Sequence, residues 1–194
     1  MRKFAIAAAL AAGTIATPAL AQDNNNLGGF RVEGLIGYDH PSISDEGADG
    51  IVYGMGVGYD FQSGNAVFGI EAEATDSSAD QSVTGFAVAG DTLRVRAGRD
   101  LYVGGRAGFG IGGNSLIYAK AGYTNARVSV DYEDGTVGTI NDFTQRTSLD
   151  GVRAGVGAQI GLGTNAYLRT EYRYSNYQDG VDRHQVVGGI GFRF

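Results

Sequence analysis

The chain has 194 residues and carries 15 Lys and Arg against 21 Asp and Glu, for a formal net charge of −6 at pH 7. This length suits one domain, with or without a leader, and the acidic balance argues against nucleic acid as a partner, because phosphates require Lys and Arg. The absence of cysteine excludes disulfides, thiolate metal sites and cysteine nucleophiles. The 33 glycines alternate with apolar residues, a pattern that suits strands better than helices.

The N-terminus has the order of a secretory signal peptide. Two basic residues precede an Ala-rich apolar run over 4–15, which is too short to cross a bilayer as a helix. Ala19 and Ala21 then form an Ala-x-Ala cleavage site, which predicts a cut before Gln22 and export of the protein. Removal of the leader would leave 13 basic against 21 acidic residues, a net charge of −8.

From residue 29 onward, apolar and polar residues alternate with period two, which predicts strands with one apolar and one polar face. The eight predicted strands cover 29–39, 51–61, 66–75, 93–109, 116–125, 149–162, 166–174 and 185–194. Tight turns are expected at 62–65, 112–114 and 163–165, and longer polar loops at 40–49, 76–91, 126–148 and 176–182. In the fourth strand the odd positions from Leu93 to Phe109 are predicted to share the apolar face.

The connections alternate between long and tight, which is typical of outer-membrane barrels with short periplasmic turns and longer external loops. We therefore predict an all-β fold, an eight-stranded antiparallel up-and-down transmembrane β-barrel. Its domain would span 29–194, after a signal peptide over 1–21 and a flexible tail over 22–28. The alternative is a lipocalin, whose eight strands turn their apolar face inward around a ligand.

Aromatic residues on the apolar face favour the transmembrane alternative, because they form two bands, as a membrane-spanning barrel requires. One band lies near the tight turns (Phe30, Tyr59, Phe61, Phe68, Phe109 and Phe192). The other lies near the long loops (Tyr38, Tyr53, Tyr123, Tyr172 and Tyr174). We also expect no helix to pack against this barrel after its last strand, whereas lipocalins normally carry one.

The polar face carries charges of both signs in the middle of strands, and these are the main candidate site. The ten residues are Arg31, Glu33, Glu71, Glu73, Arg106, Lys120, Arg153, Arg169, Glu171 and Arg173. Inside a narrow barrel they are expected to form a salt-bridge network that fills the lumen and fixes strand register. The alternative is a narrow ion path lined by the same charges.

The last strand resembles the C-terminal signal of Gram-negative outer-membrane barrels, which is recognised by the barrel-assembly machinery. Phe194 ends the chain, with Phe192 two positions and Gly189 five positions earlier. Val187 departs from the pattern, which prefers a polar residue there. The alternative is an ordinary edge strand that happens to end the chain.

Residues 118–123 (YAKAGY), 169–174 (RTEYRY) and the terminal Phe resemble the small outer-membrane β-barrels of Alphaproteobacteria, related to opacity-type proteins and the OmpA transmembrane domain. The resemblance covers 29–194 and implies an outer-membrane protein with structural, adhesive or weakly permeable roles. Expected partners are outer-membrane lipids and lipopolysaccharide, the barrel-assembly machinery during biogenesis, and a host or surface ligand bound through the loops. No nucleic acid and no cofactor are expected.

Enzymatic activity is the remaining alternative. Glu71 and Glu73 lie two residues apart on one face, as an acid–base pair could, although nearby Arg and Lys favour salt bridges. Lipid A 3-O-deacylase barrels use a His-x-Ser-Asn stretch; here Ser175-Asn176 lacks that His, and His184 is the remaining candidate base. The acidic residues of the first and third long loops (Asp39, Asp45, Glu46, Asp49; Asp131, Glu133, Asp134, Asp142) lack EF-hand spacing.

Overall fold

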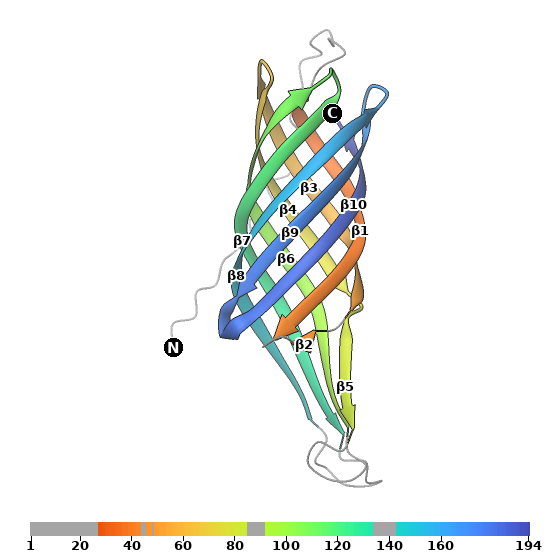
Figure 1. Ribbon diagram of the computed structural model, residues 1–194, viewed down its shortest axis with the longest axis vertical. Helices are drawn as coiled ribbons and strands as arrows, with labels where there is room; N and C mark the ends of the chain where they lie inside the picture. The colour runs from red at the N-terminus through yellow and green to blue at the C-terminus, as the bar shows by residue number, and fades with distance from the viewer. Residues whose placement is uncertain (1–26, 44–45, 48, 85–91, 134–142) are drawn as a thin grey trace.

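The computed structural model describes residues 27–43, 46–47, 49–84, 92–133 and 143–194. Eight long antiparallel strands close into a barrel (Figure 1), with two short strands and one 3₁₀ turn outside it. The barrel strands are β1 (Gly29–Ile43), β3 (Gly50–Ser63), β4 (Ala66–Ser77), β6 (Thr92–Ile111), β7 (Ser115–Glu133), β8 (Phe143–Leu162), β9 (Ala166–Tyr177) and β10 (Val181–Arg193). The others are β2 (Glu46–Gly47), β5 (Asp80–Thr84) and η1 (Gln178–Gly180). The predicted signal peptide and cleavage site lie outside the described residues and stay predictions.

Pairing between the first and last strands closes the barrel. β1 and β10 run antiparallel from the pair Arg31–Arg193 to the pair Ile43–Val181. The ring order is therefore β1-β3-β4-β6-β7-β8-β9-β10, each strand pairing with its neighbours in sequence among the barrel strands. Tight turns connect one end, where Gly64 (φ +59°) and Gly163 (φ +78°) adopt the left-handed conformation that favours glycine.

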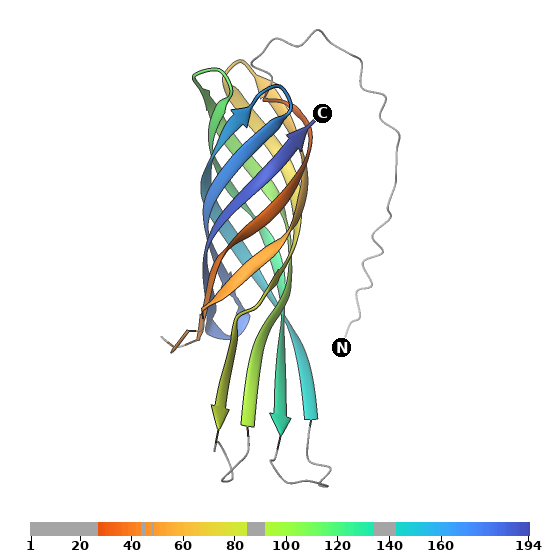
Figure 2. The ribbon, with the colours of Figure 1, turned by 90° about the vertical axis from the view of Figure 1, so that its right-hand side faces the viewer.

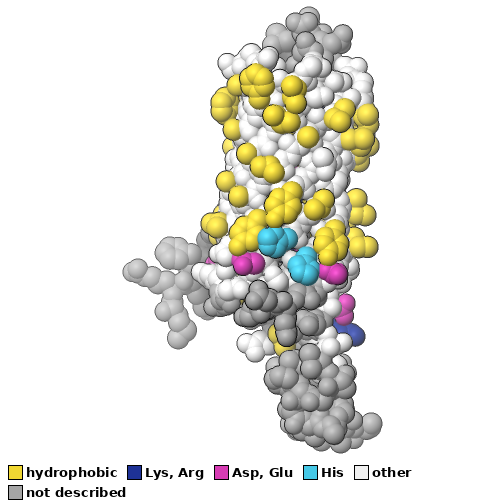
Figure 3. Space-filling model, in the orientation of Figure 1, with side chains coloured by type: hydrophobic (Ala, Val, Ile, Leu, Met, Phe, Trp, Pro, Cys, Tyr) yellow, Lys and Arg dark blue, Asp and Glu magenta, His cyan; other side chains and the backbone are white. Residues whose placement is uncertain are grey.

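The alternation of the sequence is reproduced in the barrel wall. Outward apolar side chains are exposed, among them Met55 (68%) and Val152 (66%), whereas inward neighbours such as Glu33 and Arg153 are 2% and 1% exposed. The apolar exterior contradicts the lipocalin alternative and confirms the predicted barrel. Figure 3 shows these apolar side chains spread over the wall. Among the described residues, no helix is long and apolar enough to cross a membrane.

Several of the predicted strands are shorter than the strands in the structure. The segment predicted as the longest loop, 126–148, contains the outer part of β7 up to Glu133 and the start of β8 from Phe143. The predicted loop 76–91 contains β5, which pairs with β6. These stretches are polar, and pairing with a neighbour rather than composition holds them as strands. Together they form a four-stranded protruding sheet, made of β5 and of 92–97, 127–133 and 143–148, which extends beyond the barrel (Figure 2).

The prediction that all odd positions from Leu93 to Phe109 face outward is wrong. The β6–β7 ladder shifts register between Ala97, which pairs with Val128, and Asp100, which pairs with Ala126. Two β6 residues therefore stand opposite the single residue Arg127, which is a β-bulge. Because a bulge reverses the alternation, Ala97 shares the inward side with Asp100.

The end of the predicted flexible tail is also packed. Leu27 is 4% exposed and belongs to one buried apolar cluster with Val67, Leu116 and Tyr118. Its backbone N–H donates to Oε1 of Gln62 at 2.6 Å. Leu27 therefore belongs to the barrel rather than to a tail.

Candidate functional site

The lumen of the barrel holds the main charged constellation. Among the described residues, seven acidic and seven basic side chains are buried there, so that their formal charges cancel. All ten residues proposed from the sequence are in this set, and Asp39, Asp60, Asp100 and Arg183 join them. The charges form three layers along the barrel.

The layer nearest the tight turns is centred on Asp60 of β3. Arg106 of β6 donates to it twice, from Nε at 2.9 Å and from Nη2 at 2.5 Å. Arg31 Nε and Arg193 Nη2 lie 3.3 and 3.5 Å from the same carboxylate. One acidic group thus connects four strands.

The middle layer connects opposite walls. Lys120 Nζ of β7 lies 2.9 Å from Glu71, 2.8 Å from Glu73 and 3.0 Å from Glu171. Arg173 of β9 donates from Nη1 to Glu73 Oε2 at 2.6 Å. Since β4 and β9 are four places apart in the ring of eight, the Glu73–Arg173 pair extends across the full diameter.

Arg169 completes the middle layer. Its guanidinium donates to Glu33 of β1 and to Glu171 of its own strand. Arg31 in turn pairs with Glu33 at 2.7 Å and with Glu71. Each of these carboxylates therefore contacts at least two cationic groups.

The layer nearest the loops centres on Asp39 and Asp100. Arg183 of β10 donates to Asp39 from Nε at 2.7 Å and to Asp100 from Nη1 at 3.1 Å. β6 and β10 are also four places apart, so this pair is a second bridge across the diameter. Arg153 pairs with Asp100 as well.

The assignment of Asp39 to an acidic loop is wrong, because its side chain is 0% exposed within β1. Arg183 was missed because the last strand was predicted to begin at 185, whereas β10 begins at Val181. Asp60 and Asp100 lie at polar-face positions of the alternation, and the period-two pattern alone could have placed them in the lumen.

The catalytic alternatives do not fit this geometry. Glu71 and Glu73 are both engaged in ion pairs with lysine and arginine. Ser175 is buried inside the barrel, where Arg153 Nε donates to its hydroxyl at 2.7 Å. His184 is exposed on the outer face, so the barrel wall separates it from Ser175.

The residues of the predicted assembly signal end the strand that closes the barrel. Phe192 and Phe194 point outward, with exposed fractions of 50% and 68%. Gly189 points inward, and a Cβ at this position would lie 2.8 Å from the carbonyl oxygen of Gly34. Their role in assembly stays a prediction.

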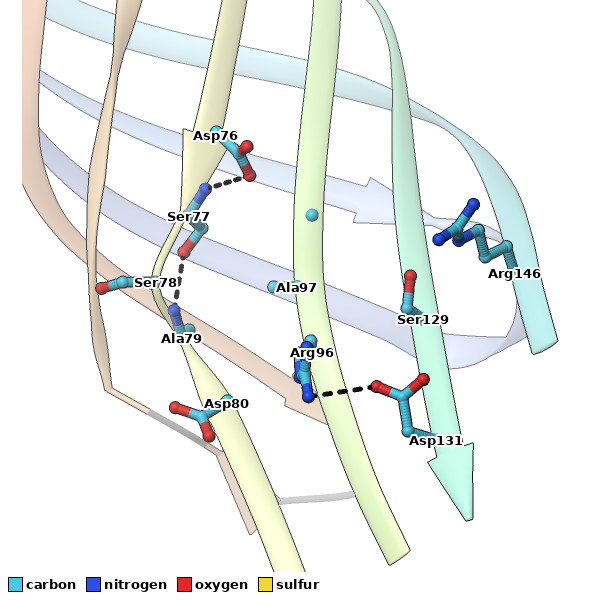
Figure 4. A pocket seen from close by; sticks show the side chains of 11 residues that line it. Asp76, Ser77, Ser78, Ala79, Asp80, Arg96, Ala97, Ser129, Asp131 and Arg146 are labelled. Atoms are coloured by element: carbon cyan, nitrogen blue, oxygen red, sulfur yellow. Dashed lines mark hydrogen bonds and ion pairs between the residues drawn. The ribbon is translucent and has the colours of Figure 1, made fainter. Parts of the chain in front are cut away.

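A second polar feature lies where the protruding sheet leaves the barrel. A pocket of about 350 Å³ is bordered by Asp76–Asp80, Arg96–Gly98, Ser129, Asp131 and Arg146. Figure 4 shows Arg96 paired with Asp131, with Nη2 and Oδ2 3.3 Å apart. Register places Asp80, Arg96, Ser129 and Arg146 in one row across the four strands.

Comparison with known proteins agrees with this architecture. Residues 7–194 match the family model of the outer membrane protein beta-barrel domain. The chain belongs to this family. It is therefore an outer-membrane protein, as the alternating wall and closed ring indicate.

Two curated relatives are outer-membrane proteins of Alphaproteobacteria. The 22 kDa outer membrane protein of Rhizobium leguminosarum bv. viciae is 29% identical, covering 86% of this chain and 77% of the relative. The 25 kDa outer-membrane immunogenic protein of Brucella ovis is 28% identical, covering 73% of this chain and 62% of the relative. These names agree with the family resemblance inferred from the sequence.

Solved structures share the fold at low identity. The attachment invasion locus protein Ail of Yersinia pestis, in complex with the heparin analogue sucrose octasulfate, has a TM-score of 0.60 at 16% identity, covering 86% of this chain and 99% of Ail. Neisserial surface protein A has a TM-score of 0.59 at 16% identity, with coverages of 85% and 97%. Both likenesses concern the barrel architecture alone.

Proposed function

We propose that this outer-membrane barrel is a sealed structural protein that conducts no ions and contacts external ligands through its protruding sheet. The observation that carries the first part is the pair of bridges across the diameter, Glu73–Arg173 and Asp100–Arg183. The interior of an eight-stranded barrel is just filled by side chains. A side chain that reaches the opposite wall therefore leaves no path for ions along the barrel axis.

Charge balance supports the same conclusion. Seven buried acids oppose seven buried bases, and the partly buried Arg193 adds one positive charge at the tight-turn end, so the lumen offers little excess charge that would attract ions of one sign. Displacing a partner to let an ion pass would leave a buried charge unpaired, which costs several kcal/mol. The network therefore acts as a plug and as a tie between strands.

Planar-bilayer recording of the purified protein tests the seal. The folded wild type, identified by its shifted gel mobility without boiling, should give no stable current steps. Arg173→Ala, which removes one bridge, should give a conductance above that baseline, and the matched variant Leu168→Ala on the lipid face of β9 should remain silent. Discrete steps from folded wild type would contradict the seal and favour a narrow diffusion channel.

The surface role rests on the arginines of the protruding sheet. Arg94, Arg96, Arg127 and Arg146 carry exposed side chains there, in a chain that is acidic overall. Sulfate or phosphate groups of a glycan are the ligands that guanidinium groups bind best. The heparin analogue bound to Ail in the solved structure makes immobilised heparin a suitable probe.

Arg127→Gln and Arg146→Gln together should weaken heparin binding, and the binding should decrease with salt. The matched variant is Thr147→Gln, because Thr147 neighbours Arg146 on the opposite face of β8. Equal binding by both variants would contradict a role for the arginines. A catalytic role is not part of the proposal, and lipid A from cells with and without the protein should have the same mass.

A further inference from the structure

The chain has two histidines, and the fold brings them together. His40 and His184 lie almost the whole chain apart in sequence, yet they are directly opposite each other on β1 and β10. Both belong to the outward face, at the end of the wall that adjoins the loops. Figure 3 shows the two histidine side chains side by side where the apolar surface ends. Neither takes part in the lumen network.

The hydrogen bonds of the two rings use the same nitrogen, Nδ1. His40 Nδ1 lies 2.7 Å from Asp49 Oδ1, and His184 Nδ1 lies 2.8 Å from the Tyr172 hydroxyl. A carboxylate can only accept, so the Nδ1 of a neutral His40 carries the proton and its Nε2 keeps a lone pair.

This arrangement is that of metal-binding histidines, in which a carboxylate or another oxygen fixes one ring nitrogen and leaves the other for the ion. Directly opposed residues of an antiparallel pair have Cβ atoms about 4.5–5.5 Å apart. Two imidazole rings at that spacing can turn toward one ion, since metal–nitrogen bonds are about 2.0–2.1 Å long. The exposed Asp49 and the partly exposed Asp182, on either side of the pair, add negative charge nearby.

We propose that His40 and His184 bind one divalent transition-metal ion through their Nε2 atoms on the outer surface of the barrel. Imidazole ligands favour Zn²⁺, Ni²⁺ and Cu²⁺ over Ca²⁺ or Mg²⁺, which prefer oxygen. No group of three or more His, Cys, Asp or Glu side chains in the described part of the chain forms a metal cluster. The site therefore has two protein ligands, and water completes the coordination.

Calorimetric titration of the untagged, detergent-extracted protein with NiCl₂, ZnCl₂ and CaCl₂ tests the site. We expect one Ni²⁺ or Zn²⁺ per chain and no comparable binding of Ca²⁺. His40→Gln and His184→Gln should each weaken binding at least tenfold, or about 1.4 kcal/mol. The double variant should show no measurable binding, because both protein ligands of the one ion are then lost.

Asp49→Asn tests the positioning role of the carboxylate and should weaken binding about tenfold or more. Asp150→Asn, which removes another exposed carboxylate at the loop end of the wall, is the matched control and should leave affinity unchanged. Binding that survives in the double variant, or no binding by wild type at millimolar metal, overturns the proposal. If a variant does not fold, the Cu²⁺ electron paramagnetic resonance spectrum of wild type tests the site instead. A spectrum with two nitrogen ligands supports the proposal, and a spectrum without them overturns it.

Discussion

Glu73→Gln is the sharpest test of the lumen network. The Glu73 carboxylate lies 2.8 Å from Lys120 Nζ and 2.6 Å from Arg173 Nη1, and its side chain is 1% exposed. Substitution by glutamine keeps the shape but leaves seven buried bases against six buried acids. Removing one partner of a buried ion pair costs about 3–5 kcal/mol, because the remaining charge is left without compensation. We expect a destabilisation of that order.

Urea unfolding of the protein in lipid vesicles measures this loss. The chain has no tryptophan, so far-UV circular dichroism and unboiled gel mobility would follow the fraction folded. The free energy of unfolding is obtained by linear extrapolation to water. Asp150→Asn is the control, because Asp150 is exposed and accepts a hydrogen bond from Asn125 at 2.7 Å. Its unfolding midpoint should remain close to that of wild type.

A second substitution separates the loss of charge balance from a general weakening of the core. Glu73→Gln with Lys120→Met removes one charge of each sign, and part of the lost stability should return. If Glu73→Gln destabilises no more than Asp150→Asn, the network does not tie the strands together. If the double variant loses the sum of both single effects, charge balance is not the cause.

Three further predictions concern the wall. Gly122→Ala should lower the free energy of unfolding by roughly 1–3 kcal/mol, since its Cβ would lie 2.3 Å from the Val103 carbonyl oxygen. Gly34→Ala is the control and should be tolerated in the same urea titration, because no atom lies within 4 Å of its Cβ. Val156→Lys places a charge on the lipid face of β8 and should cost about 2–4 kcal/mol in vesicles if it lies near the bilayer midplane. Phe194→Ser should reduce the amount of folded barrel in isolated outer membranes, without changing the stability of the purified protein by a comparable factor. An unchanged amount of folded barrel in these membranes would argue against the assembly signal.

The wall of the barrel is predictable from the sequence because its rules are local. Period-two alternation places Ile36 outside and Leu35 inside without knowledge of any partner strand. Turn chemistry similarly predicts the glycines at the tight turns. For the same reason the ten lumen charges can be named from the pattern alone.

The connections across the lumen are not predictable in this way. Which acid meets which base depends on the stagger of the strands, and therefore on pairings such as Glu73–Gly56 that composition does not encode. Composition assigns Asp39 to a loop, because its partner, Arg183, lies 144 positions away. The sequence does not predict the protruding sheet for a related reason, since its polar segments are held by pairing rather than by an apolar face.

The bulge in β6 predicts that two single-residue deletions in this strand have different effects on its pairing. Gly98 and Arg99 together stand opposite Arg127, so one of them is surplus to the ladder. Deleting Arg99 should therefore leave Arg96 opposite Ser129, as in wild type. Deleting Gly105, which has its own partner in both neighbouring strands, should shift one part of β6 by a residue and turn its side chains to the wrong face.

Engineered disulfides detect the difference, because the natural chain has no cysteine. Residues directly opposite in an antiparallel pair have Cα atoms about 4.5–5.5 Å apart, within the range that a disulfide spans. A pair made by Arg96→Cys and Ser129→Cys should cross-link in the wild-type background and equally after deletion of Arg99. The Gly105 deletion should fold poorly, by gel mobility. A cross-link from position 96 that moves from position 129 to 128 after deletion of Arg99 would mean that the ladder had slipped, and the assignment of the surplus residue to this bulge would then be wrong.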